Sequence, residues 1–148
     1  MNIKQSSGSV PSVVLDTNAA LDWFVFGDPG MTGLVAAIES GAVRWIATPR
    51  MREELLRTLT YPALSRWNPD CEHTLSRFDR WAALQPEPAR STPVGLVCID
   101  PDDQVFMDLA LTRAARWLVT HDRALHKLAR QARRAGVSIV RPGDWRPE

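Results

Sequence analysis

The feature of this sequence that most constrains its fold is a series of short apolar runs, each of which leads to an aspartate. SVVL is followed directly by Asp16, WLVTH directly by Asp122, and VGLVC within a few residues by Asp103. Apolar, β-branched runs of this length that end in polar turns are typical of strands. The pattern therefore predicts strands that place carboxylates at their C-terminal ends.

Segments with helical spacing alternate with these strands. Apolar residues at i, i+3 and i+4 indicate helices, and prolines and glycines mark where they end. Strands that alternate with helices of this length need crossover connections and form a parallel sheet between helical layers. The predicted fold class is therefore α/β, a three-layer α/β/α arrangement with a central, mainly parallel sheet. We expect helices over about residues 19–24, 34–38, 51–61, 71–84, 103–114 and 124–135, and further strands over 43–47 and 137–140.

A fourth acid joins the aspartates through a helix. Glu54 lies at the edge of the apolar stripe of the helix that starts near Met51, whereas its neighbour Glu53 is expected to face solvent. In parallel α/β sheets, ligands bind beyond the C-terminal ends of the strands. We expect Glu54 to look into the fold and to meet the aspartates there.

Carboxylates packed together raise one another's pKa unless a cation lies between them. Mg²⁺ and Mn²⁺ prefer oxygen ligands, and the three histidines and two cysteines show no spacing that favours a softer metal. A metal ion held by acids acts most often on phosphate oxygens, which points to phosphodiester hydrolysis. The ordinary alternative is that aspartates at helix starts only cap backbone N–H groups.

The length and composition are those of one globular domain. The chain has 148 residues, of which 45% are hydrophobic and 24% charged. We expect a domain over residues 12–141, between a polar N-terminal tail, 1–11, and a C-terminal tail, 142–148. No apolar run approaches the roughly 20 residues that span a membrane, and the first residues lack the apolar core of a signal peptide. The expected location is the cytoplasm.

The basic residues are unevenly distributed, although the net charge is only +1. Between residues 113 and 141 there are eight basic residues and one acid, Asp122. A solvated helix face is the ordinary explanation of such a run, and a phosphate-binding surface is the alternative. On the second interpretation, Arg123, Lys127 and Arg130 are candidate RNA-binding residues.

Four motifs in order resemble the PIN domain, in particular the branch of VapC-like ribonuclease toxins from bacterial toxin–antitoxin pairs. The resemblance extends from about residue 13 to about residue 140. Each motif is weak alone, but four in sequence at these spacings are specific. They are LDTN at 15–18, EELLRTLTYP at 53–62, CIDPDDQVFMDLAL at 98–111 and LVTHDRAL at 118–125.

The resemblance implies a Mg²⁺- or Mn²⁺-dependent ribonuclease whose metal is held by four acids: Asp16, Glu54, Asp103 and Asp122. It also implies an RNA substrate, a cognate antitoxin protein and a homodimer. Asn18 and Thr120 match polar positions that orient the acids, and Asp100 matches an auxiliary acid. Ile99 stands where this branch often has Arg, and Gln104 where a further Asp is common.

The same residues are compatible with other functions. The chief alternatives are a PIN-like scaffold that binds RNA or protein without hydrolysis and a stand-alone RNA-processing nuclease. A haloacid-dehalogenase phosphatase would need a second Asp where Asn18 stands. Three of the six tryptophans, Trp23, Trp67 and Trp81, lie in helical regions that could form a dimer or antitoxin surface, although core packing is the ordinary explanation for each.

Overall fold

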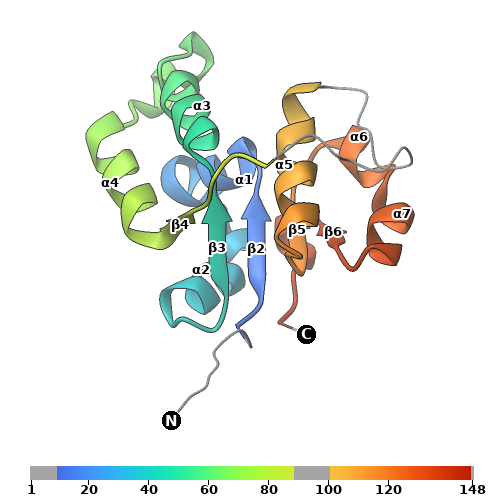
Figure 1. Cartoon of the computed structure of the whole chain (residues 1–148). Helices are drawn as coiled ribbons and strands as arrows, with labels where there is room; N and C mark the ends of the chain where they lie inside the picture. The colour runs from blue at the N-terminus through green and yellow to red at the C-terminus, as the bar shows by residue number, and fades with distance from the viewer. Residues whose placement is uncertain (1–9, 89–100, 148) are drawn as a thin grey trace.

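The computed structural model describes residues 10–88 and 101–147. Within these ranges five strands form one sheet in the order β4-β3-β2-β5-β6, and every neighbouring pair is parallel. Helices lie on both sides of this sheet (Figure 1). The predicted α/β/α arrangement with a parallel central sheet is therefore confirmed. The strands are β2 (Ser12–Leu15), β3 (Arg44–Ala47), β4 (Ala82–Leu84), β5 (Trp117–Val119) and β6 (Ser138–Val140).

The helices begin at residues that suit a helix start. Asp16, Thr48, Asp70 and Asp122 each accept a hydrogen bond from a backbone N–H of the helix that follows. Two of these caps are candidate site residues, so capping accounts for part of their placement. The α-helices are α1 (Thr17–Leu21), α2 (Thr32–Glu39), α3 (Pro49–Leu59), α4 (Cys71–Trp81), α5 (Pro101–Thr112), α6 (Arg123–His126) and α7 (Ala129–Arg134). A π-helix, η2 (Asp22–Phe26), and the 3₁₀ turns η3 (Pro29–Met31), η4 (Pro62–Trp67) and η6 (Pro142–Asp144) complete the set.

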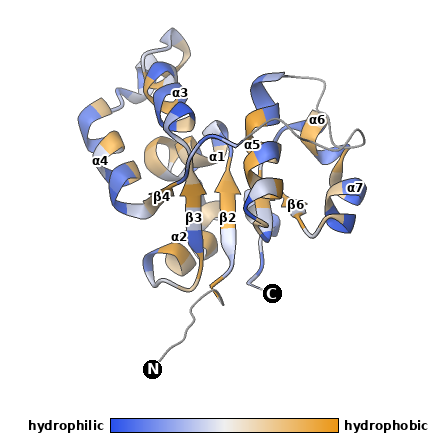
Figure 2. Cartoon of the chain, viewed as in Figure 1, coloured by the Kyte–Doolittle hydropathy of each residue, from blue (hydrophilic) through white to orange (hydrophobic). Residues whose placement is uncertain are grey.

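The core lies on both faces of the sheet. Val13 and Val14 on the central strand β2 are fully buried, as expected for a parallel strand covered by helices on both sides. Figure 2 shows hydrophobic residues along β2 and β3, with polar residues only at the start of each strand. Trp45 on β3 packs against the rings of Trp23 and Phe78, at centroid distances of 5.5 and 5.0 Å. This packing fixes the strands whose C-terminal ends carry the acids.

The helix predicted over 71–84 is three residues too long. Helix α4 ends at Trp81, and Ala82–Leu84 form β4, which pairs with β3. Alanine and leucine favour helices, but the unpaired edge of β3 offers hydrogen bonds that a longer helix would leave unused. In place of the single helix predicted over 124–135, the structure has two helices, α6 and α7. The strand predicted at 94–98 lies outside the described residues.

The segment after residue 141, predicted as a tail, packs against the domain. Pro142 and Trp145 are buried, and the Trp145 ring lies 5.3 Å from that of Trp117 on β5. Burial of a large aromatic side chain stabilises the fold by more free energy than is lost when a short terminal segment becomes ordered. In the part of the chain that the structure describes, no helix is long and apolar enough to cross a membrane.

Candidate active site

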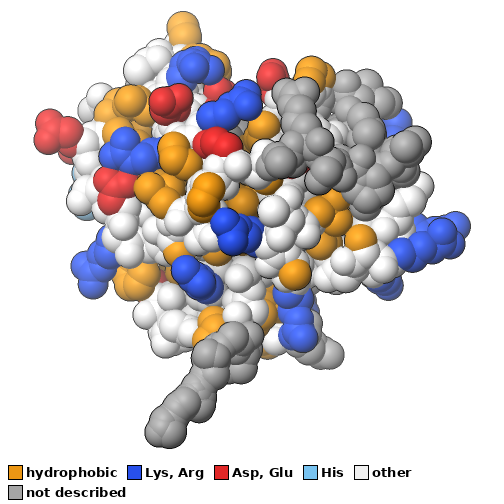
Figure 3. All heavy atoms as spheres, viewed as in Figure 1, with side chains coloured by type: hydrophobic (Ala, Val, Ile, Leu, Met, Phe, Trp, Pro, Cys, Tyr) orange, Lys and Arg blue, Asp and Glu red, His pale blue; other side chains and the backbone are white. Residues whose placement is uncertain are grey.

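One cavity, with a volume of about 580 Å³, lies beyond the C-terminal ends of the central strands. Six acids line it, and among them are the four predicted ligands: Asp16 after β2, Glu54 on α3, Asp103 on α5 and Asp122 after β5. The other two are Asp102 and Glu53, the second of which was expected to face solvent only. Figure 3 shows acidic and basic side chains side by side over α3. The structure thus brings together the four acids that the sequence singled out.

Asp16 is the most buried of the four, with only 4% of its surface exposed. Its Oδ1 accepts a hydrogen bond from the backbone N–H of Ala19 at 2.8 Å, and its Oδ2 accepts one from Thr120 Oγ1 at 2.5 Å. Burial raises the pKa of Asp16 above its ordinary value, and the two hydrogen bonds oppose that rise. Asp16 is therefore held in one orientation, in a place that disfavours an uncompensated negative charge.

Thr120 connects two of the acids. Its hydroxyl donates to Asp16 and accepts from the backbone N–H of Asp122 at 2.9 Å. The Thr120 carbonyl accepts a hydrogen bond from His126 Nε2 at 2.7 Å. Because Thr120 is fully buried, these contacts fix the turn that carries Asp122 relative to the end of β2.

Asp122 and Asp103 share a hydrogen bond between their carboxyl groups. This bond from Asp103 is the main reason that the pKa of Asp122 is lowered, and backbone N–H groups of α6 contribute as well. One of these is the N–H of Ala124, 2.6 Å from Asp122 Oδ1. The side chains of Asp103 and Asp122, which come from segments far apart in the sequence, therefore interact at this cavity.

Glu54 has a cation as its partner. Its Oε1 lies 2.8 Å from Arg57 Nη1, one turn along α3, and its Oε2 is 3.4 Å from Thr58 Oγ1. Both Arg57 and Thr58 line the cavity. These acids therefore have different partners: hydrogen-bond donors at Asp16, Asp103 and backbone N–H groups of α6 at Asp122, and Arg57 at Glu54.

Of the other predicted site residues that the structure describes, some line the cavity and some do not. Asn18 lines the cavity, and Asp100 lies outside the described residues. The proposed RNA-binding residues are exposed on or beside α6 and α7 and are absent from the cavity lining. They are Arg123, Lys127 and Arg130.

The cations that line the cavity, among the described residues, are instead Arg50 and Arg57 on α3. The sequence analysis missed both. The available signal was the position of Arg57, three residues after Glu54 in the EELLR motif, which places the two side chains on one helical face.

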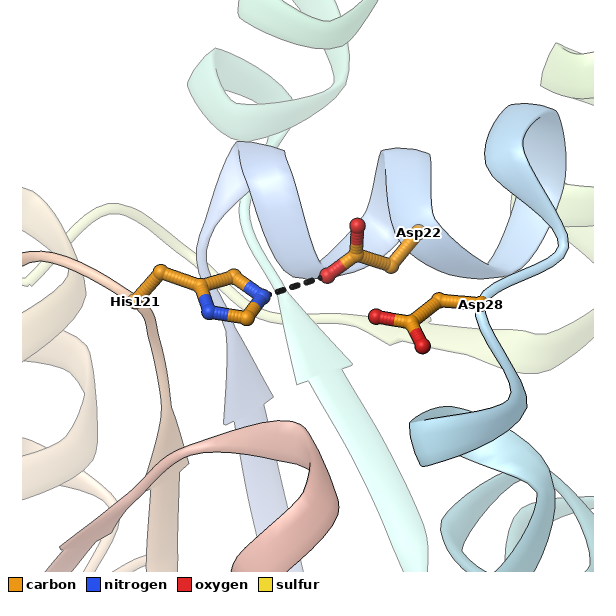
Figure 4. Close-up of side chains that lie close together, drawn as sticks. All are labelled: Asp22, Asp28 and His121. Carbon is orange, nitrogen blue, oxygen red and sulfur yellow. Dashed lines mark hydrogen bonds and ion pairs between the residues drawn. The ribbon is translucent and has the colours of Figure 1, made fainter.

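A second polar cluster, also missed, lies outside the lining of this cavity (Figure 4). One ligand-type atom from each of Asp22, Asp28 and His121 lies within 4.8 Å of the others. His121 Nε2 donates to Asp22 Oδ2 at 2.7 Å. Burial is the main cause that raises the pKa of Asp22, the bond from His121 lowers it, and the charge of Asp28 raises it. Asp22 begins the π-helix η2 and Asp28 caps the 3₁₀ turn η3 that follows it, and the backbone N–H of Asp28 donates to the Asp22 carbonyl at 2.9 Å.

The comparisons with known proteins decide the family. The sequence model described as "PIN domain" matches residues 12–124, about three quarters of the chain. The chain belongs to the PIN-domain family. The matched range includes all six acids that line the cavity, and the PIN-domain prediction made from the motifs is confirmed.

One solved structure shows the same fold. The crystal structure of VapBC2 from Rickettsia felis bound to a DNA fragment from their promoter is similar to this PIN domain with a TM-score of 0.57. The alignment covers 86% of this chain and 96% of that chain at 10% sequence identity, so the likeness concerns the fold. No curated protein matches the sequence.

The donor atoms of the PIN-domain cavity suit a hard divalent cation. Its acids offer only carboxylate oxygens, and no histidine or cysteine of the described residues lines it. Burial raises the pKa of Asp16, which shows that its carboxylate lacks a compensating positive charge. A divalent ion would supply that charge.

Proposed function

We propose that this PIN domain is a Mg²⁺- or Mn²⁺-dependent endoribonuclease that hydrolyses RNA phosphodiester bonds. The observation that carries the proposal is the convergence of four acids, from positions 16 to 122, on one cavity. PIN domains are generally nucleases, and the resemblance to the ribonuclease branch of the family specifies RNA.

The ligands of the metal would be Asp16, Glu54, Asp103 and Asp122. When bound, a divalent ion activates water and neutralises charge on phosphate oxygens. Asp16 is already oriented by Ala19 and Thr120, so it needs little rearrangement. Asp103 and Asp122 already interact with each other, and a divalent ion held by both would offset the repulsion between their charges.

The test is cleavage of a labelled, unpaired RNA in Mg²⁺, in Mn²⁺ and in EDTA. We expect cleavage with either metal and none in EDTA, and we expect Asp16→Asn to abolish it. Asp144→Asn is the matched control, because Asp144 is exposed and does not line the cavity. Metal-independent cleavage, or full activity of Asp16→Asn, would refute the proposal. A protein that binds RNA without cutting it would favour the scaffold alternative.

We further propose that the chain is the toxin of a type II toxin–antitoxin pair and acts in the cytoplasm as a homodimer. The motif resemblance and the likeness to the VapBC2 assembly support a protein partner. Large apolar side chains are exposed within one stretch of α3 and η4, where a partner could cover them. They are Leu56, Tyr61 and Trp67. Of the other tryptophans considered for this surface, Trp23 is buried and Trp81 half-buried.

Genomic context and light scattering test this second part. A short gene for a DNA-binding protein beside this gene, whose product co-purifies with the chain and blocks cleavage, would support the pair. Absence of such a gene would favour a stand-alone RNA-processing nuclease. A monomer at micromolar concentration, measured by light scattering, would contradict the homodimer.

A further inference from the structure

Arg57 and a bound metal ion would compete for the same carboxylate, that of Glu54. Its guanidinium is 2.8 Å from Glu54 Oε1, and both side chains line the acidic cavity. In the metal-free protein Arg57 supplies the positive charge beside Glu54. A divalent ion bound through Glu54 would supply the same charge and leave Arg57 without its partner.

We infer that Arg57 is an RNA-binding residue that exchanges Glu54 for a phosphate of the substrate when the metal binds. The inference rests on the proposed nuclease function and extends it to a residue outside the four acids. Arg57 would hold a backbone phosphate at the cavity through its planar guanidinium, a group well suited to phosphate oxygens.

The ion pair between Arg57 and Glu54 can separate at little energetic cost. The side chain of Arg57 is 64% exposed and that of Glu54 40% exposed, so water competes for both partners. The pair joins residues three apart on one helix, and neither partner supports another element of the fold through it. After Arg57 departs, Glu54 still has the Thr58 hydroxyl within reach.

The charge around the cavity favours a phosphate over a structural role. Within the described residues, the only Arg or Lys side chains in the lining are those of Arg50 and Arg57. A polyanion that reaches the acids therefore meets two cations in the lining of the same cavity. Arg52, on the same helix, is bound to Asp79 at 2.7 Å and does not line the cavity, which makes it a control of equal charge.

The experiment compares Arg57→Gln with Arg52→Gln, and includes Arg57→Lys. The first readout is the affinity for a labelled, unpaired RNA as salt is varied, with Ca²⁺ as the divalent ion to suppress cleavage. Loss of one phosphate contact reduces the slope of log K against log salt by about 0.7, which is roughly fourfold in affinity at about 0.15 M salt. The second readout is Mn²⁺ affinity without RNA, measured by calorimetry.

We expect Arg57→Gln to bind RNA about fourfold more weakly with the reduced slope, and to bind Mn²⁺ more tightly than the wild type. Arg52→Gln should change neither, and Arg57→Lys should restore most of the slope. An Arg57→Gln protein with the slope of Arg52→Gln would overturn the inference, and so would unchanged Mn²⁺ affinity. If the wild type itself neither binds nor cuts RNA with metal, the proposed function fails instead.

Discussion

The replacement Asp16→Asn tests whether the buried carboxylate lowers the stability of the fold without metal and raises it when a metal is bound. Asn has nearly the same shape. Its Oδ1 can accept from the N–H of Ala19, and its Nδ2 can donate to Thr120 Oγ1, so both contacts can form, the second with its direction reversed. The main change is therefore the loss of a negative charge at a site where 4% of the residue is exposed.

Without metal, the direction of the stability change caused by Asp16→Asn follows from the raised pKa of Asp16, whose chief cause is burial. Folding favours the protonated form, so the wild type loses stability as the pH rises from the ordinary value of 3.8 through the raised value. Asn has no such group. We expect metal-free Asp16→Asn to be at least as stable as the wild type at neutral pH, with a difference that shrinks on acidification.

With metal bound, the wild type should be more stable than Asp16→Asn. A ligand at one hundred times its Kd stabilises the folded state by about 2.7 kcal/mol. For a chain of this length, about 2–4 °C in Tm per kcal/mol makes this a rise of roughly 5–11 °C. If the replacement weakens metal binding about 100-fold, the remaining stabilisation is about 0.4 kcal/mol and the rise about 1–2 °C.

The assay is thermal unfolding of both proteins with EDTA and with Mn²⁺, at neutral pH and near pH 4. The reasoning is refuted if Mn²⁺ raises the Tm of both proteins equally, because Asp16 would then not be a ligand. It is also refuted if Asp16→Asn without metal is clearly less stable than the wild type at neutral pH, because the charge would then stabilise the fold.

Three further replacements probe separate parts of the structure. Trp145→Ala should cost about 3–5 kcal/mol of unfolding free energy in urea, whereas a true tail would show almost no change. His121→Ala should cost about 1–3 kcal/mol because it removes the hydrogen-bond partner of buried Asp22, and adding Asp22→Asn should recover most of that loss. An additive double replacement would contradict this. Thr120→Val keeps the side-chain shape but removes the hydroxyl that orients Asp16, and should weaken Mn²⁺ binding about 10- to 100-fold in a calorimetric titration. Equal affinity would show that the hydroxyl has no such role.

The sequence by itself determined the features that depend on local pattern. The apolar run before Asp16 forms β2 with the predicted bounds, Ser12–Leu15, because a strand buried on both faces must be continuously apolar. The alternation of strands and helices was enough to predict the parallel sheet and the end of it where the acids gather. The order of four motifs was enough to predict the family.

Only the tertiary structure decided the features that depend on contacts between distant segments. Ala82–Leu84 form a strand because the edge of β3 is open beside them, although their own preference is helical. The interaction between Asp103 and Asp122, the cluster around Asp22 and the burial of Trp145 likewise join parts of the chain that no local pattern relates. Residue type and spacing limit what a segment can form, but partners from elsewhere in the chain set its final structure and shift the pKa of its acids.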